Sequence, residues 1–477
     1  MIRKVLVANR GEIAIRIMRT CREMGIEPVM IYSTADREAL HVELAGTTVC
    51  VGGPAPGESY LNMKNILAAA LGSGCDAIHP GYGFLAERAD FAELVIASGL
   101  KFIGPRPETI RLLGNKARAR QLMMSAGVPV TPGSDGILDS VDEAVDLADQ
   151  LGFPILLKAD AGGGGRGMRR VDQAADLPAA YVEATNEAEQ AFGNGALYME
   201  KLISAPKHLE FQILADAAGN VIHLGERDCS LQRRRQKMIE ESPCATLSPE
   251  LRDEMGAAAI RAAQAADYLG AGTVEFVLDN DGNYYFIEVN TRIQVEHPVT
   301  EVLTGIDLIR EQIRIASGQN LTFSQEDIRL DGHAIECRIN AESPEQDFRP
   351  SPGRIERFVM PGGPGVRIDS AVYPGCSVSP RYDSMIGKVI VHARNRREAV
   401  RRMRRCLEEL IIEGIDTNVM LLYVLLYEKD FIRGTYNTEY VEAHLPRLLE
   451  YISNPEAYDD PVLLSVPEAY DDKEMSE

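Results

Sequence analysis

The amino-acid sequence predicts a multidomain protein of the α/β and α+β classes, and three observations support this. With 477 residues the chain is too long for one compact core. Its N-terminal part alternates apolar strands with amphipathic helices, the pattern of a parallel sheet covered by helices. A stretch rich in glycine and proline then interrupts this pattern, and a larger unit with hairpin character follows.

The first hundred residues repeat a strand-helix-strand pattern. The strand-like runs are 4–8, 28–32, 76–79 and 101–104. An amphipathic helix with Ile13 and Ile17 on its apolar side follows the first run. Strands joined in this way predict a parallel, doubly wound sheet up to about residue 112. The first turn, Asn9-Arg10-Gly11, lacks the glycine fingerprint of dinucleotide-binding proteins, which disfavours that function.

Two later segments differ in composition from the rest. Residues 128–203 contain several prolines and a glycine-rich run at 162–167, directly after a short strand, and we expect a small mobile lid there. The C-terminal tail contains Pro-Glu-Ala-Tyr-Asp-Asp twice, at 455–460 and 467–472. We interpret it as a low-complexity acidic tail, with a docking segment as the alternative.

Charge and cysteine content restrict the function classes. The formal net charge of −21 opposes binding to nucleic acid or an anionic membrane, so anionic substrates need local basic clusters such as 232–237. The eight cysteines are scattered and show no zinc-ligand spacing, which is typical of reduced thiols in the cytosol. The apolar run that ends at Ala8 is too short for a signal peptide or a membrane span, and we expect a cytoplasmic protein.

The segment 272–290 predicts a hairpin with two facing carboxylates. Asp281-Gly282 has the preferred chemistry of a two-residue type I′ turn. With that turn, Glu275 lies directly opposite Glu288, at about 5 Å between Cβ atoms. Like charges at this distance need a neutralising partner, and a divalent cation is one.

Asn290 follows on the same face of the hairpin and completes a set of three hard oxygen donors, which suits Mg²⁺ or Mn²⁺ bridging nucleotide phosphates. The alternative is a solvated polar face. Val277, Tyr284 and Phe286 share that face in this register, while Phe276 lies on the other, so both faces are expected to be buried.

The alternation continues beyond the hairpin. If the chain stays extended, Glu288, Asn290, Arg292, Gln294 and Glu296 form one wall of metal ligands, a guanidinium, an amide and a further carboxylate. Such a wall suits an anion that is held, polarised and deprotonated. An exposed amphipathic strand has the same pattern and is the alternative.

The glycine-rich run is not a Walker A loop, because no Gly-Lys-Ser/Thr follows it. Its backbone amides can approach phosphate closely, and Lys158 upstream adds positive charge. We therefore expect a loop that folds over a triphosphate, with a flexible linker as the alternative.

Several long motifs resemble the biotin carboxylase family of the ATP-grasp superfamily, in the family's order. They are Ala8-Asn9-Arg10-Gly11-Glu12, His79-Pro80-Gly81-Tyr82-Gly83-Phe84, Gly162 to Met168, Glu226-Arg227-Asp228-Cys229-Ser230, Glu288 to Pro298, and Arg381-Tyr382-Asp383-Ser384-Met385. The resemblance covers residues 1 to about 446. It implies an ATP-grasp fold with five segments: 1–112, Rossmann-like; 113–203, the first ATP-grasp part with the lid; 204–330, the second part with the metal and bicarbonate site; 331–446, a mixed C-terminal domain; and 447–477, the tail.

The resemblance also implies roles for individual residues. Those expected at ATP are Lys116, Lys158, Gly164, Gly165, Glu200, Lys201, Leu202, Ile203, His208, Gln232 and Arg235. Glu275, Glu288 and Asn290 are expected to hold two Mg²⁺ or Mn²⁺ ions, and Lys237, Arg292, Gln294 and Val295 to bind bicarbonate. Glu296 is similar to the general base and Arg338 to the stabiliser of the biotin enolate, with Asp383 nearby.

The implied reaction uses ATP and bicarbonate to carboxylate biotin through carboxyphosphate. The chain lacks an Ala-Met-Lys-Met biotinylation motif, so biotin is expected on a separate carrier protein. Carboxyltransferase subunits and a homodimer are further family expectations. Acetyl-CoA is the expected final acceptor, with pyruvate or another acyl-CoA as alternatives.

One departure from the family is visible, because many members have histidine where this chain has Arg235. We expect altered nucleotide affinity from it. Less favoured functions are an ATP-grasp ligase joining a carboxylate to an amine, and a non-catalytic regulatory subunit.

Overall fold

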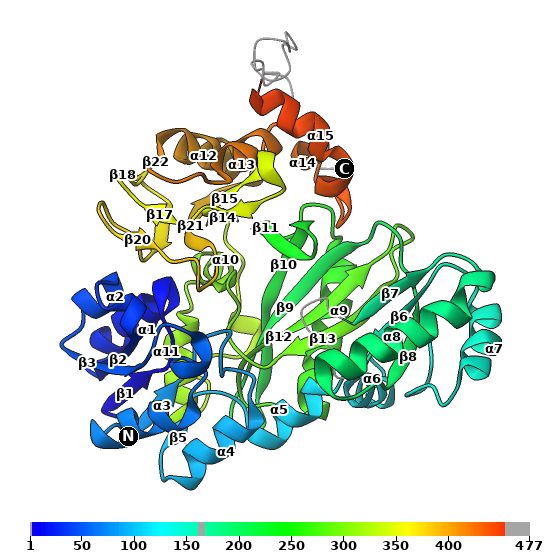
Figure 1. Cartoon of the computed structure of the whole chain (residues 1–477), viewed down its shortest axis with the longest axis horizontal. Coiled ribbons are helices and arrows are strands. Elements are labelled where there is room, and N and C mark those ends of the chain that lie inside the picture. Colours follow the sequence, from blue (N-terminus) through cyan, green and yellow to red (C-terminus); the bar gives the residue numbers. More distant parts are fainter. Residues whose placement is uncertain (1, 161–166, 454–477) are drawn as a thin grey trace.

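The computed structural model describes residues 2–160 and 167–453. Figure 1 shows an eight-stranded sheet in the middle of the molecule. The N-terminal domain, in blue, lies on one side of it, and a small three-stranded layer lies on the other. The orange and red C-terminal elements cover one end.

The N-terminal domain contains a five-stranded sheet in the order β3-β2-β1-β4-β5, and every pairing in it is parallel. Its strands are β1 (Lys4–Val7), β2 (Glu27–Ser33), β3 (Thr47–Gly52), β4 (Ala77–His79) and β5 (Lys101–Phe102). The helices α1 (Gly11–Glu23), α2 (Leu40–Glu43), α3 (Met63–Gly72) and α4 (Ala89–Ala97) connect them. The predicted parallel sheet is therefore confirmed. The half-exposed edge strand β3 has weak apolar character and was not predicted.

The lid region is a separate small layer. It contains the antiparallel sheet β7-β6-β8, built from β6 (Ile155–Ala159), β7 (Met168–Val171) and β8 (Leu197–Lys201). Helices α7 (Val141–Leu151) and α8 (Leu177–Phe192) share a core with this sheet. Helices α5 (Pro107–Gly114) and α6 (Lys116–Ser125) lead into it from the N-terminal domain. Most of the glycine-rich run, including Gly164 and Gly165, lies outside the described residues.

The central sheet has the order β13-β12-β9-β10-β11-β14-β21-β19. Its strands are β9 (Lys207–Ala215), β10 (Val221–Arg233), β11 (Gln236–Ser242), β12 (Gly270–Leu278), β13 (Tyr284–Asn290), β14 (His333–Asn340), β19 (Val366–Ser370) and β21 (Met385–Ala393). The sheet thus joins strands from the predicted segments 204–330 and 331–446. The division of the chain into five segments remains a prediction.

Helices on both faces of this sheet determine which side chains meet. α9 (Pro249–Ala265) packs on β9 and β10. α10 (His297–Thr304) packs near Ala334 of β14, whereas α12 (Arg396–Glu409) packs near the following residue, Ile335. Because successive side chains of a strand point to opposite faces, α10 and α12 cover opposite faces of β14.

The remaining elements are peripheral. They are α11 (Leu308–Ala316), α13 (Val419–Leu425), α14 (Lys429–Arg433) and α15 (Tyr440–Ser453), with the short strands β15 (Glu342–Ser343), β16 (Arg349–Pro350), β17 (Gly353–Arg354), β18 (Arg357–Val359), β20 (Ser377–Val378) and β22 (Ile411–Glu413). Across residues 2–160 and 167–453, the helices are too short or too polar to cross a bilayer.

The hairpin β12-β13 confirms the predicted pairing of Glu275 with Glu288 but not its turn. The connection is longer than two residues, because Asp279 N donates to Asn283 O at 2.9 Å and Gly282 occupies the tip with a φ of 86°. A bulge compensates for the different loop. Phe276 pairs with Phe286, so Ile287 is an extra residue that restores the register of the glutamates.

Because of this bulge, the predicted side-chain faces of the hairpin are wrong for two residues of β13. Tyr284 and Phe286 do not share the face of the glutamates but join Phe276 in the core. The ring centroid of Phe276 lies 5.6 Å from that of Tyr284 and 6.5 Å from that of Phe286, both edge-on. The extra residue reverses the alternation between the loop and Glu288.

The bulge can be tested by a double-mutant cycle between Phe276 and Phe286. We expect a coupling of about 0.5–1.5 kcal/mol in the free energy of unfolding, because the two rings touch. Urea denaturation of the two single leucine variants and the double variant measures it. The same cycle between Phe276 and Tyr285, on opposite faces, should give no coupling. Equal coupling in both cycles would contradict the bulged register.

Candidate functional site

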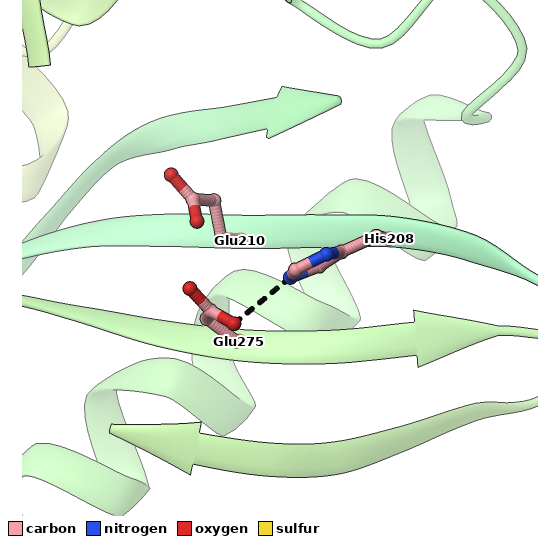
Figure 2. A group of neighbouring side chains, drawn as sticks. All are labelled: His208, Glu210 and Glu275. Carbon is pink, nitrogen blue, oxygen red and sulfur yellow. Dashed lines mark hydrogen bonds and ion pairs between the residues drawn. The ribbon is translucent and has the colours of Figure 1, made fainter. Parts of the chain in front are cut away.

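Glu275 on β12 is the centre of a buried polar cluster. One carboxylate oxygen accepts from His208 on β9 at 2.9 Å. The other accepts from Lys237 at 3.1 Å, from Asn290 at 2.8 Å and from Gln294 at 2.9 Å. Figure 2 shows Glu275 beside His208, with Glu210 on the same side of the sheet. Burial alone would raise the pKa of Glu275, but Lys237 and His208 outweigh it and hold the pKa well below its ordinary value.

The ammonium group of Lys237, on β11, joins three carboxylates. Its Nζ lies 2.6 Å from Glu210, 3.1 Å from Glu275 and 2.6 Å from Glu296. Burial lowers the pKa of Lys237, but the anionic groups around it raise the pKa well above its ordinary value overall. Lys237 is therefore a permanent cation at the point where three strands and a helix meet.

Glu296 lies at the N-cap position of α10 and is fully buried. One of its oxygens accepts from Lys237, and the other accepts from Nη2 of Arg338 at 2.9 Å. Burial favours the neutral acid, but Lys237, Arg338 and Arg227 hold the pKa of Glu296 well below its ordinary value. The carboxylate is thus ionised at neutral pH, the protonation state that a general base requires.

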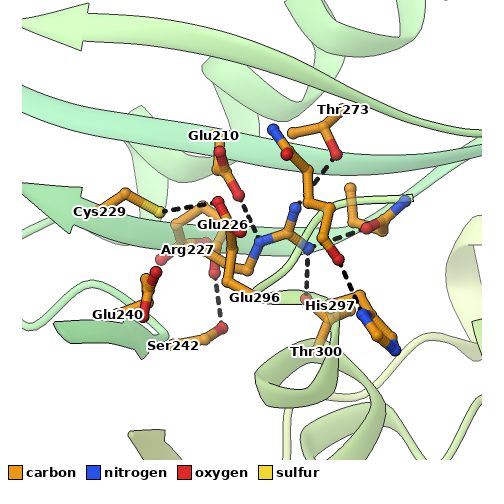
Figure 3. A network of polar contacts seen from close by, with 12 residues as sticks. Glu210, Glu226, Arg227, Cys229, Glu240, Ser242, Thr273, Glu296, His297 and Thr300 are labelled. Atoms are coloured by element: carbon orange, nitrogen blue, oxygen red, sulfur yellow. Dashed lines mark hydrogen bonds and ion pairs between the residues drawn. The ribbon is translucent and has the colours of Figure 1, made fainter. Parts of the chain in front are cut away.

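A second buried cation, Arg227 on β10, pairs with Glu210, one of the three carboxylates around Lys237. Its guanidinium donates to Glu210 at 2.6 Å, and to Gln212, Thr300 and Thr273 at 2.9 to 3.1 Å. Figure 3 shows this network around Arg227 and Glu296. The guanidinium fixes β9 against α10, because it donates both to Glu210 and Gln212 on β9 and to Thr300 on α10.

The residues after β13 do not form the predicted extended wall. The strand ends at Asn290, and a turn leads to α10. A bend replaces the strand because Arg292 contacts its own neighbours, donating to Gln294 at 2.7 Å and to Asn290 at 3.2 Å. The turn nevertheless brings Gln294 and Glu296 to the cluster. Val295 contributes its carbonyl oxygen, which accepts from Lys388 at 2.5 Å.

The two predicted metal-binding glutamates lie in different surroundings. Glu288 faces Glu275 in the register of the hairpin, and its carboxylate pairs with Lys116 at 3.1 Å. Among the histidines, cysteines, aspartates and glutamates of the described chain, the groups of three whose donor atoms are close enough to share an ion are His208, Glu210 and Glu275, and Glu210, Cys229 and Glu296. The hard oxygen donors of Glu275, Glu288 and Asn290 suit Mg²⁺ or Mn²⁺ chemically. Their role as ligands stays a prediction.

The residues predicted at ATP lie on the lid sheet, on the central sheet and at the start of α6. Lys158 forms an ion pair with Glu200 across the lid sheet. Lys201 donates to the carbonyl oxygens of Gly152 and Phe153, both at 3.0 Å. The other residues predicted at ATP within the described chain are Lys116 at the start of α6, His208 on β9, Gln232 near the end of β10, and Leu202 and Ile203 directly after β8.

Arg235 and Asp383 lie at exposed positions. Arg235 is in the turn between β10 and β11, with a φ of 66°, and it contacts the sulfur of Met168 in the lid at 3.5 Å. Asp383 accepts a hydrogen bond from the backbone of Met385 within its own loop, at 2.9 Å. Their proposed roles at nucleotide and substrate remain predictions.

Several residues of the cluster were not predicted from the sequence. They are Glu87, which pairs with Arg292 at 2.9 Å, together with Glu210, Arg227, Cys229 and Glu240. The sequence does contain a signal for Glu210, because His208, Glu210 and Gln212 alternate with apolar residues along 207–215. Glu87 and Arg227 meet the site only through the tertiary fold.

Three family models match almost the whole described chain. "Biotin carboxylase, N-terminal domain" matches residues 1–110, "Carbamoyl-phosphate synthase L chain, ATP binding domain" matches 115–324, and "Biotin carboxylase C-terminal domain" matches 336–443. The chain is 54% identical to Biotin carboxylase 1 of Bacillus subtilis over 445 residues, which cover 93% of this chain and 99% of that protein. It is 50% identical to the 2-oxoglutarate carboxylase small subunit of Hydrogenobacter thermophilus over 465 residues, 98% of both chains.

Solved structures give the same result. The biotin carboxylase domain dimer of the Hydrogenobacter thermophilus 2-oxoglutarate carboxylase, in complex with MgADP, ADP and bicarbonate, has a TM-score of 0.91 and 52% identity, covering 94% of this chain and 99% of that one. Biotin carboxylase of Campylobacter jejuni has a TM-score of 0.91 and 49% identity, covering 93% and 99%. The resemblance inferred from the motifs is therefore confirmed, and the chain belongs to the biotin carboxylase family, whose members are ATP-dependent ligases.

Proposed function

We propose that Glu296 and Arg338 act on successive steps in this biotin carboxylase, with Lys237 serving the first. The observation that carries the proposal is that both cations bond to the same carboxylate, Glu296, from opposite sides. A base held between two cations is ionised and adjacent to positive charge, which is what an acidic anion such as bicarbonate needs in order to bind and lose its proton.

In the first step, Glu296 removes the proton of bicarbonate, and an oxygen of the resulting anion attacks the γ-phosphoryl group of ATP. ADP leaves and carboxyphosphate forms. Lys237, Arg292 and Gln294 are proposed to hold the bicarbonate oxygens. Lys237 lies between Glu275 and Glu296, Gln294 donates to Glu275, and Arg292 donates to Gln294. Glu275, Glu288 and Asn290 are the residues that would hold the Mg²⁺ or Mn²⁺ ions, and these ions would supply positive charge to the phosphates.

In the second step, carboxyphosphate breaks into CO₂ and phosphate. The phosphate takes the N1 proton of biotin, and the biotin enolate attacks CO₂. Arg338 is proposed to stabilise the enolate oxygen. Its guanidinium is a fixed cation, because Glu240 and Glu296 raise its pKa above the ordinary value in spite of burial. Closure of the lid over the site protects carboxyphosphate from water.

The partners follow from this chemistry. Biotin is proposed to arrive on a separate carrier protein, and carboxyltransferase subunits are proposed to consume the carboxybiotin. A homodimer is supported by the dimeric Hydrogenobacter thermophilus structure. The cytoplasm is the proposed location, because all eight cysteines are unpaired and six of them are buried.

Acetyl-CoA is the proposed final acceptor, with 2-oxoglutarate as the second candidate. The second is favoured by the 2-oxoglutarate carboxylase small subunit, which matches 98% of both chains. Purification of the tagged protein with its native carrier and transferase tests the choice. Fixation of radiolabelled bicarbonate is then measured with acetyl-CoA, 2-oxoglutarate and pyruvate. Fixation with acetyl-CoA alone is expected, and fixation with only one of the others would overturn the assignment.

The separation of steps predicts different defects for Glu296→Ala and Arg338→Ala. Glu296→Ala should slow ATP cleavage about 10²- to 10⁴-fold, the usual contribution of a general base. Arg338→Ala should reduce carboxybiotin formation about 10²- to 10³-fold, as for loss of an oxyanion stabiliser, while bicarbonate-dependent ATP cleavage without biotin largely survives. Phosphate release and carboxybiotin formation are measured side by side. Equal loss of both activities in Arg338→Ala would place the arginine in the ATP step.

The proposed metal role of Glu288 predicts a changed Mg²⁺ requirement. In Glu288→Gln the Mg²⁺ concentration for half-maximal ATP cleavage should rise about 10- to 100-fold or more, since losing even an outer partner of a metal ligand has that effect. Glu413→Gln is the matched control, because Glu413 pairs with Arg357 on an exposed surface. An unchanged Mg²⁺ dependence in Glu288→Gln would rule out Glu288 as a ligand.

A further inference from the structure

Two buried glutamates, one on β11 and one on β14, lie next to Arg338 in the central sheet. Glu240 on β11 and Glu336 on β14 are register partners, and both side chains are fully buried. Residues directly opposite each other on antiparallel strands have Cβ atoms about 4.5–5.5 Å apart. Glu336 also shares a face of β14 with Arg338, two residues further on, and this is the face that α10 covers. The three side chains therefore form one group inside the sheet.

Hydrogen bonding in this group is incomplete. Glu240 Oε1 accepts from Nε of Arg338 at 2.5 Å. Glu240 Oε2 and both oxygens of Glu336 have no hydrogen-bond partner among the described residues, although all three atoms are buried. A buried charge without a partner is strongly disfavoured, and two ionised carboxylates side by side are more so. A proton on one of the two carboxyl groups would remove this repulsion and supply a hydrogen-bond donor.

Neighbouring cations do not neutralise Glu336, because each of them already has other partners. Arg338 bonds to Glu240 and Glu296. Lys388, opposite Arg338 on β21, lies 3.2 Å from Glu12 and donates to the carbonyl oxygen of Val295.

The other titratable groups that face the pair do not supply a free positive charge. They are Lys237, which is occupied by its three carboxylates, Tyr82, which donates to Glu12, and the thiol of Cys229 on β10. Burial raises the pKa of Glu336 well above its ordinary value in spite of Lys388, and burial raises the pKa of Glu240 to about 7 in spite of Arg338.

We propose that Glu336 is a neutral carboxylic acid that donates its proton to the free oxygen of Glu240, and that this acid pair positions the guanidinium of Arg338 against Glu296. Glu240 remains an anion, holds Nε of Arg338 and accepts from Glu336 on its other oxygen. Both glutamates are fully buried and act through Arg338, so both are positioning residues. The catalytic part of the inference rests on the proposed role of Arg338, whereas the protonation of Glu336 does not.

The pair responds to pH in a defined direction. The folded protein holds on Glu336 a proton that the unfolded chain releases at an ordinary carboxyl pKa. The stability that this proton gives is present below that ordinary pKa and is lost as the pH rises through the raised pKa of the folded state. Once Glu336 ionises, it repels Glu240, and Arg338 loses its fixed position.

Infrared spectroscopy tests the protonation directly. The wild-type protein at neutral pH should show the C=O band of a protonated carboxyl group that is missing in Glu336→Gln. Glu240→Gln is the matched control and should keep this band, because the proton resides on Glu336. A band kept in Glu336→Gln but lost in Glu240→Gln would put the proton on Glu240 and overturn the assignment. An identical band in all three proteins would overturn the acid pair.

Kinetics test the positioning role. Glu336→Gln still offers a neutral N–H donor to Glu240, so carboxybiotin formation at neutral pH should stay within about threefold of wild type, which is near the lower end of the cost of one lost hydrogen bond. Its rate should also lose the alkaline decline that deprotonation of Glu336 causes. Glu336→Ala removes the donor and should lower carboxybiotin formation about 10- to 100-fold, the usual range for a buried hydrogen bond to a charged group.

The two measurements separate the possible failures. If the infrared result holds but both variants form carboxybiotin like wild type at every pH, the acid pair exists and its positioning role is wrong. If Glu336→Ala does not fold, the pH profile of Glu336→Gln still decides the role. Failure of the predictions for Glu296→Ala and Arg338→Ala would overturn the proposed function without changing the infrared expectation.

Discussion

The ion pairs of Lys237 are the contacts on which the rest of the site depends. One ammonium group neutralises carboxylates from β9, β12 and the start of α10, at 2.6 to 3.1 Å. Each carboxylate alone would be strongly disfavoured in a buried position. Removal of the ammonium would leave three anions together, so the geometry of both strands and of α10 depends on this one side chain.

Arg227 and Arg338 neutralise two of the same carboxylates from the sides that Lys237 does not contact. Arg227 satisfies the far side of Glu210, and Arg338 satisfies the far side of Glu296. The result is a chain of alternating charges that crosses the central sheet from β12 to β14. Acids outnumber bases along it once Glu240 and Glu336 are included. This excess of acids favours one protonated carboxyl group within the network, in agreement with the proposed acid pair.

The parts of the structure that the sequence predicts are those with local signals. The parallel N-terminal sheet follows from repeated strand and helix patterns, and the pairing of Glu275 with Glu288 follows from alternation on both strands. The longer loop and the bulge at Ile287 were not predicted. The loop shifts the register by one residue and the bulge shifts it back, so the predicted pairing of the glutamates is right without either feature. Arg227 and Glu87 join the site only by tertiary contacts, which no spacing along the chain reveals.

The continuity of the central sheet has a consequence for how this chain can be divided. Residues 334–337 of β14 pair with residues 239–242 of β11, the strand that carries Lys237. A fragment ending near residue 330 would leave β11 as an open edge with unpaired backbone groups, which favours aggregation. It would also lack Arg338, the partner that Glu240 uses. The C-terminal third is therefore no detachable module, and insertion or fusion points belong in surface loops rather than at the boundary between these two strands.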